Sequence, residues 1–322
     1  MKGAIDEGAC TQQAPPMADA PAHVLAVPSV RVLRDVAALM KPRITAMATV
    51  VAAGAMLLAT YQKAPRALAL ADGALALLAI AMAVAGAGAL NMFIERDVDA
   101  LMERTRDRPL PARRLEPLWG LLVGGGLSLG ALPILWAVGG ALPVALTVFS
   151  LFVYVLVYTP MKRTSPWALV VGAVPGAMPA LMGSSVVSGR FDIVGTALFV
   201  VVFLWQLPHF LAIATYREGE YTAAGHKVFP ALWGIQATKM MIAVTTLLVA
   251  ASGVSLWALG IAGPRFAVVA VALGVWFVCT ALPGLTQRAR AADDVWARKF
   301  FLGTLVWQTV LFAALALDPV LQ

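Results

Sequence analysis

Residues 73–90, GALALLAIAMAVAGAGAL, contain no charged side chain and lead directly into the polar stretch NMFIERDVDALMERTRDRP at 91–109. An apolar run of about twenty residues is long enough to cross the hydrocarbon of a bilayer as a helix. Acids and bases this dense are costly at the end of a membrane helix, so they indicate a functional site. On a helix, Asn91, Glu95 and Asp99 recur every four residues and therefore share one face.

That face presents two carboxylates and an amide oxygen, which are ligands that suit Mg²⁺. Asp97 would point roughly 200° away from Glu95, so it is left out of the expected ligands. Arg104, Arg106 and Arg108 follow at once, and guanidinium groups bind phosphate well. Together these features predict a ligand that carries a diphosphate and an apolar tail. The alternative is a solvated helix end whose acids pair with the nearby arginines.

The composition excludes an ordinary soluble domain, because 61% of the residues are hydrophobic and 13% are charged, against about 25% charged in soluble domains. The net charge of +7 could suggest a nucleic-acid partner. However, the basic residues lie between apolar stretches, where they report membrane topology. We therefore expect membrane lipid around the chain and no nucleic acid.

The chain divides into a tail at 1–30, rich in Ala, Pro and Gln and expected to be disordered, and one polytopic membrane domain at 31–322. The predicted fold is an all-α integral membrane protein with about nine transmembrane helices. The apolar stretches are 44–61, 72–94, 117–138, 140–158, 166–185, 194–216, 237–262, 266–283 and 301–317.

The distribution of basic residues predicts the orientation of these helices. If the N-terminus is cytoplasmic, the opposite side holds Lys63, Arg66, Arg190 and Arg265, which leaves 20 of the 24 Lys and Arg on the cytoplasmic side. Such a bias is typical of the positive-inside rule. An odd number of spans then puts the C-terminus in the periplasm, and we expect a multi-pass protein of the bacterial cell inner membrane.

This topology gathers the remaining polar motifs on one face. Tyr158-Thr-Pro-Met-Lys162-Arg163 follows the fourth stretch, and Arg217-Glu218-Gly219-Glu220-Tyr221 follows the sixth. Lys41-Pro42-Arg43 precedes the first stretch. Two acidic patches that face each other across a cavity, with bases between them, would hold Mg²⁺ and a diphosphate.

At these motifs the chain resembles the UbiA superfamily of intramembrane prenyltransferases. Asn91, Glu95 and Asp99 match its pattern Asn-x-x-x-Asp/Glu-x-x-x-Asp, and Tyr158-x-x-x-Lys162-Arg163 matches Tyr-x-x-x-Lys-Arg. Within the superfamily, the chain resembles the heme O synthase branch through Lys41-Pro42-Arg43, GAMP at 176–179 and LWQLPHFLAI at 204–213. Five ordered motifs are far more specific than one.

The resemblance implies nine helices around a central cavity and Mg²⁺-dependent transfer of farnesyl from farnesyl diphosphate to a vinyl group of heme B. Water would add in the same reaction, giving heme O and diphosphate for terminal oxidase maturation. Heme A synthase or oxidase assembly proteins would be the partners.

The resemblance also implies roles for individual residues. The expected metal ligands are Asn91, Glu95, Asp99, Glu218 and Glu220. The expected catalytic residues are Asn91, Glu95, Asp99, Lys162 and Arg163. The expected substrate-binding residues are Arg43, Arg104, Arg108, Tyr158, Trp205 and His209.

The second acidic motif departs from the family pattern of Asp-Tyr followed by an apolar, proline-containing run. Glu220-Tyr221 replaces Asp-Tyr, and His226-Lys227 adds charge where the family is apolar. Glu can still bind Mg²⁺, but its longer side chain shifts the metal.

Other functions remain possible from these residues. A sister enzyme would prenylate an aromatic acid or chlorophyllide, and a heme or lipid carrier would bind without catalysis. The acids lie at helix ends, which disfavours a transporter with acids near the membrane centre. The basic residues could serve only as positive-inside anchors, and His209 could serve only to hydrogen-bond another helix.

Overall fold

The computed structural model describes residues 30–62, 65–66, 68–287 and 289–321, so the expected tail lies outside the described residues apart from Val30. In this part of the chain every regular element is a helix. Nine helices within these ranges are long and apolar enough to cross a membrane, which confirms the predicted fold class. They are α2 (Pro42–Tyr61), α3 (Leu70–Asp99), α4 (Pro117–Gly139), α5 to α6 (Ala141–Met161), α7 (Ala168–Ser188), α8 (Ile193–Tyr216), α11 (Ile235–Ala258), α12 (Pro264–Thr286) and α13 (Arg290–Leu321).

Shorter helices that the apolar pattern does not reveal complete the fold. They are α1 (Val30–Leu39), α9 (Glu218–Ala223) and α10 (Phe229–Trp233). The fourth span is continuous but changes character, from α5 (Ala141–Leu151) through a π-helical segment (Phe152–Tyr158) to α6 (Thr159–Met161). π-Helical turns widen the backbone and are frequent at functional sites.

The ninth span is longer than its apolar stretch, because its first turns at Arg290 precede the predicted start at 301. Lys239 of α11 pairs with Asp293 in these turns at 2.8 Å, and both side chains are buried. A buried ion pair between helices lets a polar turn pack inside the protein. Hydropathy alone could not reveal this extension.

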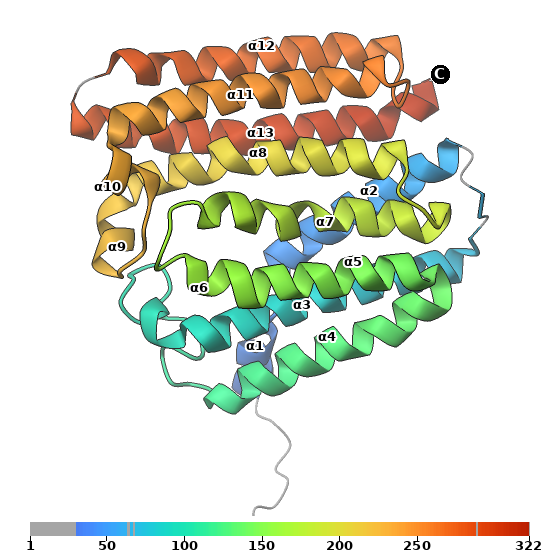
Figure 1. Ribbon diagram of the computed structural model, residues 1–322, viewed down its shortest axis with the longest axis horizontal. Coiled ribbons are helices and arrows are strands. Elements are labelled where there is room, and N and C mark those ends of the chain that lie inside the picture. The colour runs from blue at the N-terminus through green and yellow to red at the C-terminus, as the bar shows by residue number, and fades with distance from the viewer. Residues whose placement is uncertain (1–29, 63–64, 67, 288, 322) are drawn as a thin grey trace, which may run out of the picture.

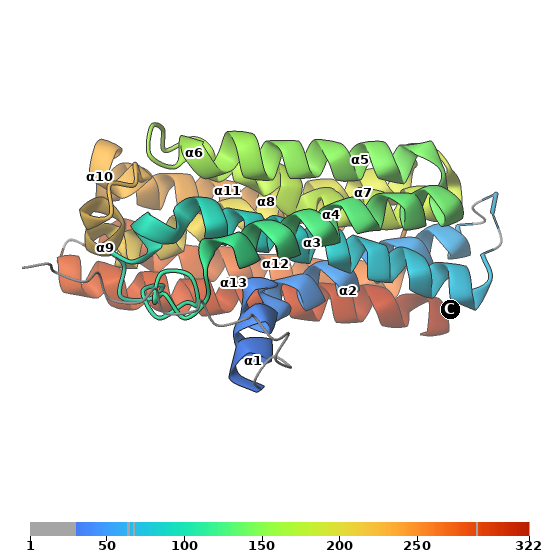
Figure 2. The same cartoon turned by 90° about the horizontal axis from the view of Figure 1, so that it is seen from below.

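The long helices lie side by side, with α7 and α8 between α3, α4 and α5 on one side and α11, α12 and α13 on the other (Figure 1). Figure 2 shows α1 projecting from this bundle; it packs through Leu39 on Ala89 and Met92 of α3. Of the nine spans, α7 is the most deeply buried.

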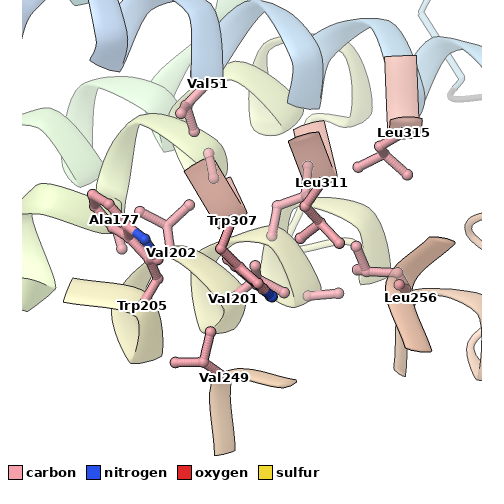
Figure 3. Packing of buried hydrophobic residues seen from close by; sticks show 14 of the residues in the cluster. Val51, Ala177, Val201, Val202, Trp205, Val249, Leu256, Trp307, Leu311 and Leu315 are labelled. Atoms are coloured by element: carbon pink, nitrogen blue, oxygen red, sulfur yellow. The ribbon is translucent and has the colours of Figure 1, made fainter. Parts of the chain in front are cut away.

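Small residues let the central helices approach closely. A Cβ at Gly183 of α7 would lie 2.1 Å from the Ala52 carbonyl oxygen of α2, so only glycine fits this crossing. Larger side chains of α2, α8, α11 and α13 pack in one hydrophobic cluster, which includes Val51, Trp205, Val249 and Trp307 (Figure 3).

The polar motifs lie at one end of this bundle. Figure 1 shows α6, α9 and α10 at that end, while α2 ends, α3 begins and the connections α4–α5, α7–α8 and α11–α12 turn at the opposite end. The bundle therefore brings together loops that are far apart in the sequence, as the alternation of spans predicts.

Candidate functional site

The last turns of α3 form one wall of the candidate site. Asn91, Glu95 and Asp99 lie on the buried face of this helix, with 2%, 6% and 2% of their surface exposed. The Asp97 side chain points away and is 82% exposed. The helical period therefore selects the three predicted residues and rejects the fourth acid, as expected.

Lys162 joins this wall to the fourth span. Its ammonium donates hydrogen bonds to both carboxylate oxygens of Glu95, at 2.8 and 2.7 Å. The amide of Asn91 also donates to Glu95, at 2.7 Å, and to the Thr159 hydroxyl, at 3.1 Å. The Lys162 ammonium lies 4.6 Å from the ring centre of Tyr158. The site thus places a lysine against Glu95, which a second predicted ligand, Asn91, also hydrogen-bonds.

Lys41 enters the site from the turn between α1 and α2. Its φ of 48° is left-handed, which is uncommon for a residue other than glycine, and Pro42 then starts α2. The ammonium of Lys41 donates to the Asn91 side-chain oxygen at 2.6 Å. Burial, followed by the charges of Arg108 and Lys162, lowers the pKa of Lys41 to about 7.

The sequence analysis selected Arg43 from this motif and missed Lys41. The Arg43 side chain is exposed on the first turn of α2. The Lys41-Pro42-Arg43 motif indicated that a base from this segment belongs to the site. Which of the two bases reaches the site depends on the left-handed turn at Lys41, which the sequence does not reveal. Such left-handed residues often mark functional sites.

Arg108 closes the site from the loop after α3. Its guanidinium donates to the Asp99 carboxylate at 2.6 Å. The buried Thr105 hydroxyl donates to the Asp99 backbone oxygen at 2.8 Å, which holds this loop against the helix end. The Arg163 and Arg104 side chains are exposed at the edge of the same region.

The two acids of the second motif point to different places. Glu220 accepts hydrogen bonds from the Arg104 backbone amide at 2.9 Å and from the Arg217 side chain at 2.7 Å. It therefore connects α9 to the loop after α3 that carries Arg104 and Arg108. Burial would raise the pKa of Glu220, but these two hydrogen bonds lower it below its ordinary value. Glu218 instead pairs with Arg290 of α13 at 2.6 Å.

Trp205 and His209 lie along the side of α8 that faces α13. The Trp205 indole donates to the Thr304 backbone oxygen, and the His209 Nδ1 contacts the Thr304 hydroxyl, each at 2.7 Å. Their rings stack at 4.6 Å, and Phe301 lies 4.8 Å from His209. Among the described residues, no hydrogen bond or ring contact joins them to Glu95 or Lys162, so their substrate-binding roles stay predictions.

The oxygen atoms at the end of α3 fit a magnesium ion by their chemistry. Within the described ranges no group of three His, Cys, Asp or Glu could hold a metal. However, Mg²⁺ commonly takes one or two carboxylates and completes its ligands with substrate phosphates and water. Asn91, Glu95 and Asp99 supply such oxygens, which here accept hydrogen bonds from Lys41, Lys162 and Arg108.

A partly open cavity of about 110 Å³ lies beside these polar residues, with Lys41 in its wall. Lys41 and Tyr154 lie at its polar part, and α2, α3, the fourth span and α7 line the rest. The apolar part includes Ile44, Ala83, Val84, Leu151, Pro179 and Met182. Asn91, Glu95, Asp99, Lys41, Lys162 and Arg108 form what we call the charged cluster. Lys41 therefore belongs both to the charged cluster and to the wall of an apolar cavity.

Known proteins share this sequence pattern and this fold. The sequence matches the UbiA prenyltransferase family over residues 46–305. It is 44% identical to a protoheme IX farnesyltransferase of Anaeromyxobacter dehalogenans, over 89% of this chain and 94% of that protein. The fold is similar to a structure of digeranylgeranylglyceryl phosphate synthase, with a TM-score of 0.75, 13% identity, and coverage of 90% of this chain and 99% of that one. It is also similar to a UbiA homologue from Archaeoglobus fulgidus bound to GPP and Mg²⁺, with a TM-score of 0.63, 15% identity, and coverage of 88% and 99%.

Proposed function

This chain belongs to the UbiA prenyltransferase family, and from that premise we propose that it transfers farnesyl from farnesyl diphosphate to a vinyl group of heme B. Water adds in the same reaction, so the products are heme O and diphosphate. Relatives that share most of the chain's length are named protoheme IX farnesyltransferase, which supports this acceptor and donor.

One observation carries the proposal at the level of geometry. The charged cluster meets the apolar cavity at Lys41, which hydrogen-bonds Asn91 and also lines the cavity. A prenyl diphosphate likewise has a charged diphosphate and an apolar isoprenoid chain, which are joined at one C–O bond. The cavity of about 110 Å³ is smaller than a typical ligand pocket of ~300–1,000 Å³. We assign to it the isoprenoid unit next to the diphosphate, with the rest of the farnesyl chain extending beyond it.

The side chains of this chain act mainly on the leaving group. Lys41, Lys162 and Arg108 hold positive charge where negative charge grows as the C–O bond breaks and the diphosphate takes the electron pair. The farnesyl carbon becomes an allylic cation, shielded from bulk water by the apolar cavity. The heme vinyl group attacks this carbon, and water adds to the resulting cation and loses a proton.

Magnesium would be held by Asn91, Glu95 and Asp99 on one side and by Glu220 on the other, and Glu218 would join them only after leaving its ion pair with Arg290. When bound, Mg²⁺ neutralises diphosphate charge and makes it a better leaving group. Arg108 pairs with Asp99 and Lys162 with Glu95, so these two bases would turn from the carboxylates toward the diphosphate oxygens when Mg²⁺ is held there.

The remaining assignments concern heme and the membrane. We assign Trp205 and His209 to heme orientation, since an aromatic face and an imidazole suit a tetrapyrrole. The protein lies in the bacterial inner membrane with its charged cluster on the cytoplasmic side, and it passes heme O to heme A synthase or oxidase assembly proteins.

An acceptor panel tests this function against its rivals. The purified protein in detergent receives farnesyl diphosphate and Mg²⁺ with heme B or with an aromatic acid, and products are weighed by mass spectrometry. Heme B that gains one farnesyl group plus water supports the proposal. A prenylated aromatic acid would identify the sister enzyme, and bound but unaltered heme would identify a carrier.

A further inference from the structure

His226 lies in the connection between α9 and α10, next to the charged cluster. Its backbone amide donates to the Tyr221 backbone oxygen at 2.9 Å, and the preceding residue, Gly225, adopts a φ of 79°. The next amide, of Lys227, donates to the Lys162 backbone oxygen at 2.9 Å. The bond from Lys227 holds the α9–α10 connection against the end of the fourth span, at Lys162, which pairs with Glu95.

The imidazole of His226 is buried, with 7% of its surface exposed, and its Nδ1 has no hydrogen-bond partner. A buried polar atom without a partner is unfavourable unless a ligand or water satisfies it. The Tyr221 ring packs beside the imidazole at 5.9 Å, which fixes one side of it. The next backbone amide bonds the Lys162 backbone, so the imidazole lies beside the residue that pairs with Glu95, and the charges of Lys162, Glu95, Arg163 and Asp99 act on it.

The balance of charge around His226 favours an anion as its missing partner. Glu95 is already paired with Lys162, and Asp99 with Arg108. Lys41 adds a further basic group, which hydrogen-bonds the neutral Asn91 side chain, and a bound anion would favour its charged form. The cluster thus holds more cations than carboxylates, and its surplus positive charge would be met by phosphate oxygens.

We propose that His226 is a further diphosphate-binding residue, whose Nδ1–H donates a hydrogen bond to an oxygen of the prenyl diphosphate. This inference rests on the proposed function, since it assigns a role at the same site. The geometry requires a donor at the Nδ1 position. The amide nitrogen of asparagine reaches that position, whereas the amide nitrogen of glutamine lies closer to that of Nε2.

The test compares three variants with the wild type: His226→Asn, His226→Phe and, as a matched control on the same loop, Lys227→Gln. The Lys227 side chain is exposed, and its backbone bond to Lys162 survives the substitution. The measurements are KM for farnesyl diphosphate, KM for heme B, kcat, and calorimetric binding of inorganic pyrophosphate with Mg²⁺. Thermal unfolding in detergent shows whether each variant is folded.

The proposal expects His226→Phe to raise KM for farnesyl diphosphate and Kd for pyrophosphate in parallel, by roughly tenfold or more, the loss of a hydrogen bond to a charged group. KM for heme B stays unchanged, and His226→Asn recovers most of the affinity. Equal effects of His226→Phe and Lys227→Gln, or pyrophosphate binding like the wild type in every variant, would overturn it.

Two further outcomes separate the possible failures. In the first, the His226 variants need more Mg²⁺ to bind pyrophosphate, and high Mg²⁺ restores the wild-type affinity. That result would make His226 a metal ligand and would reject the hydrogen bond to the diphosphate. A wild type that binds pyrophosphate but never alkylates heme would reject the proposed function, while the binding comparison among the variants would still decide the role of His226.

Discussion

At the scale of single residues, the site depends on charges that hold one another in place. Glu95 is buried and accepts hydrogen bonds from both Lys162 and Asn91. Removing one partner of a buried ion pair leaves an unpaired charge, which destabilises a protein far more than removing both. This asymmetry allows the structural role of the pair to be separated from its catalytic role.

Replacing Lys162 by Met should therefore lower stability by roughly 3 kcal/mol and activity by roughly 100-fold, because leaving-group stabilisation is lost. The double variant Lys162→Met with Glu95→Gln should recover the unfolding temperature in detergent but not the turnover. Turnover that returned together with stability would show that the pair serves only the fold.

The two bases of the Lys41-Pro42-Arg43 motif provide a matched comparison. Lys41 donates to Asn91, whereas the Arg43 side chain is exposed. We expect Lys41→Met to weaken prenyl diphosphate binding roughly tenfold or more, since a hydrogen-bonded ammonium is lost. Arg43→Met should change KM for the diphosphate less than twofold. A larger effect at Arg43 would restore the assignment made from the sequence.

The sequence predicted only part of this site, for a physical reason. Asn91, Glu95 and Asp99 follow from helical periodicity, which acts over neighbouring turns. Lys41 and His226 reach the cluster through backbone turns with positive φ at Lys41 and Gly225. Sequence patterns do not reveal such turns at a lysine, because most residues other than glycine avoid them.

At the scale of helices, the close packing of α7 against α2 holds two walls of the apolar cavity in place beside the charged cluster. Gly183 lies where α7 crosses α2, and a side chain there would meet the Ala52 backbone oxygen. Small residues at such crossings let membrane helices pack through their backbones. Backbone atoms cannot rotate away, so this contact tolerates no addition.

Gly183→Ala should therefore destabilise the protein by roughly 1–3 kcal/mol, the usual effect of overpacking. Gly125→Ala on α4 is the control, since a Cβ there meets no atom within 4 Å. Thermal unfolding of both variants in the same detergent checks the difference. A similar unfolding temperature for the two would mean that α2 and α7 can separate without loss.

The long spans were predictable because each needs about twenty apolar residues, whatever it packs against. The short helices α1, α9 and α10 and the first turns of α13 were not, since tertiary contacts stabilise them. The Asp35 carboxylate of α1, for example, accepts hydrogen bonds from Arg114 at 3.0–3.2 Å, across 79 residues of sequence.

At the scale of the whole molecule, the alternation of spans puts the charged cluster at one end of the bundle and the hairpin turns at the other (Figure 1). The excess of Lys and Arg predicts that the cluster faces the cytoplasm. In a chain without Cys10 and Cys279, a cysteine at Phe191 should react with a membrane-impermeant maleimide from the periplasm. A cysteine at Arg106, exposed near the cluster, should react only after lysis. The reverse pattern would invert the orientation.

The central claim is that this one charged cluster breaks the prenyl–oxygen bond for transfer to heme. The most direct test measures diphosphate released and farnesylated, hydrated heme formed in the same reaction, with Mg²⁺, by the wild type and by Asp99→Asn. The account predicts equal amounts of the two products from the wild type and a loss of both, by roughly 100-fold, in the variant. Diphosphate released without a heme product, or an unchanged rate in Asp99→Asn, would contradict it.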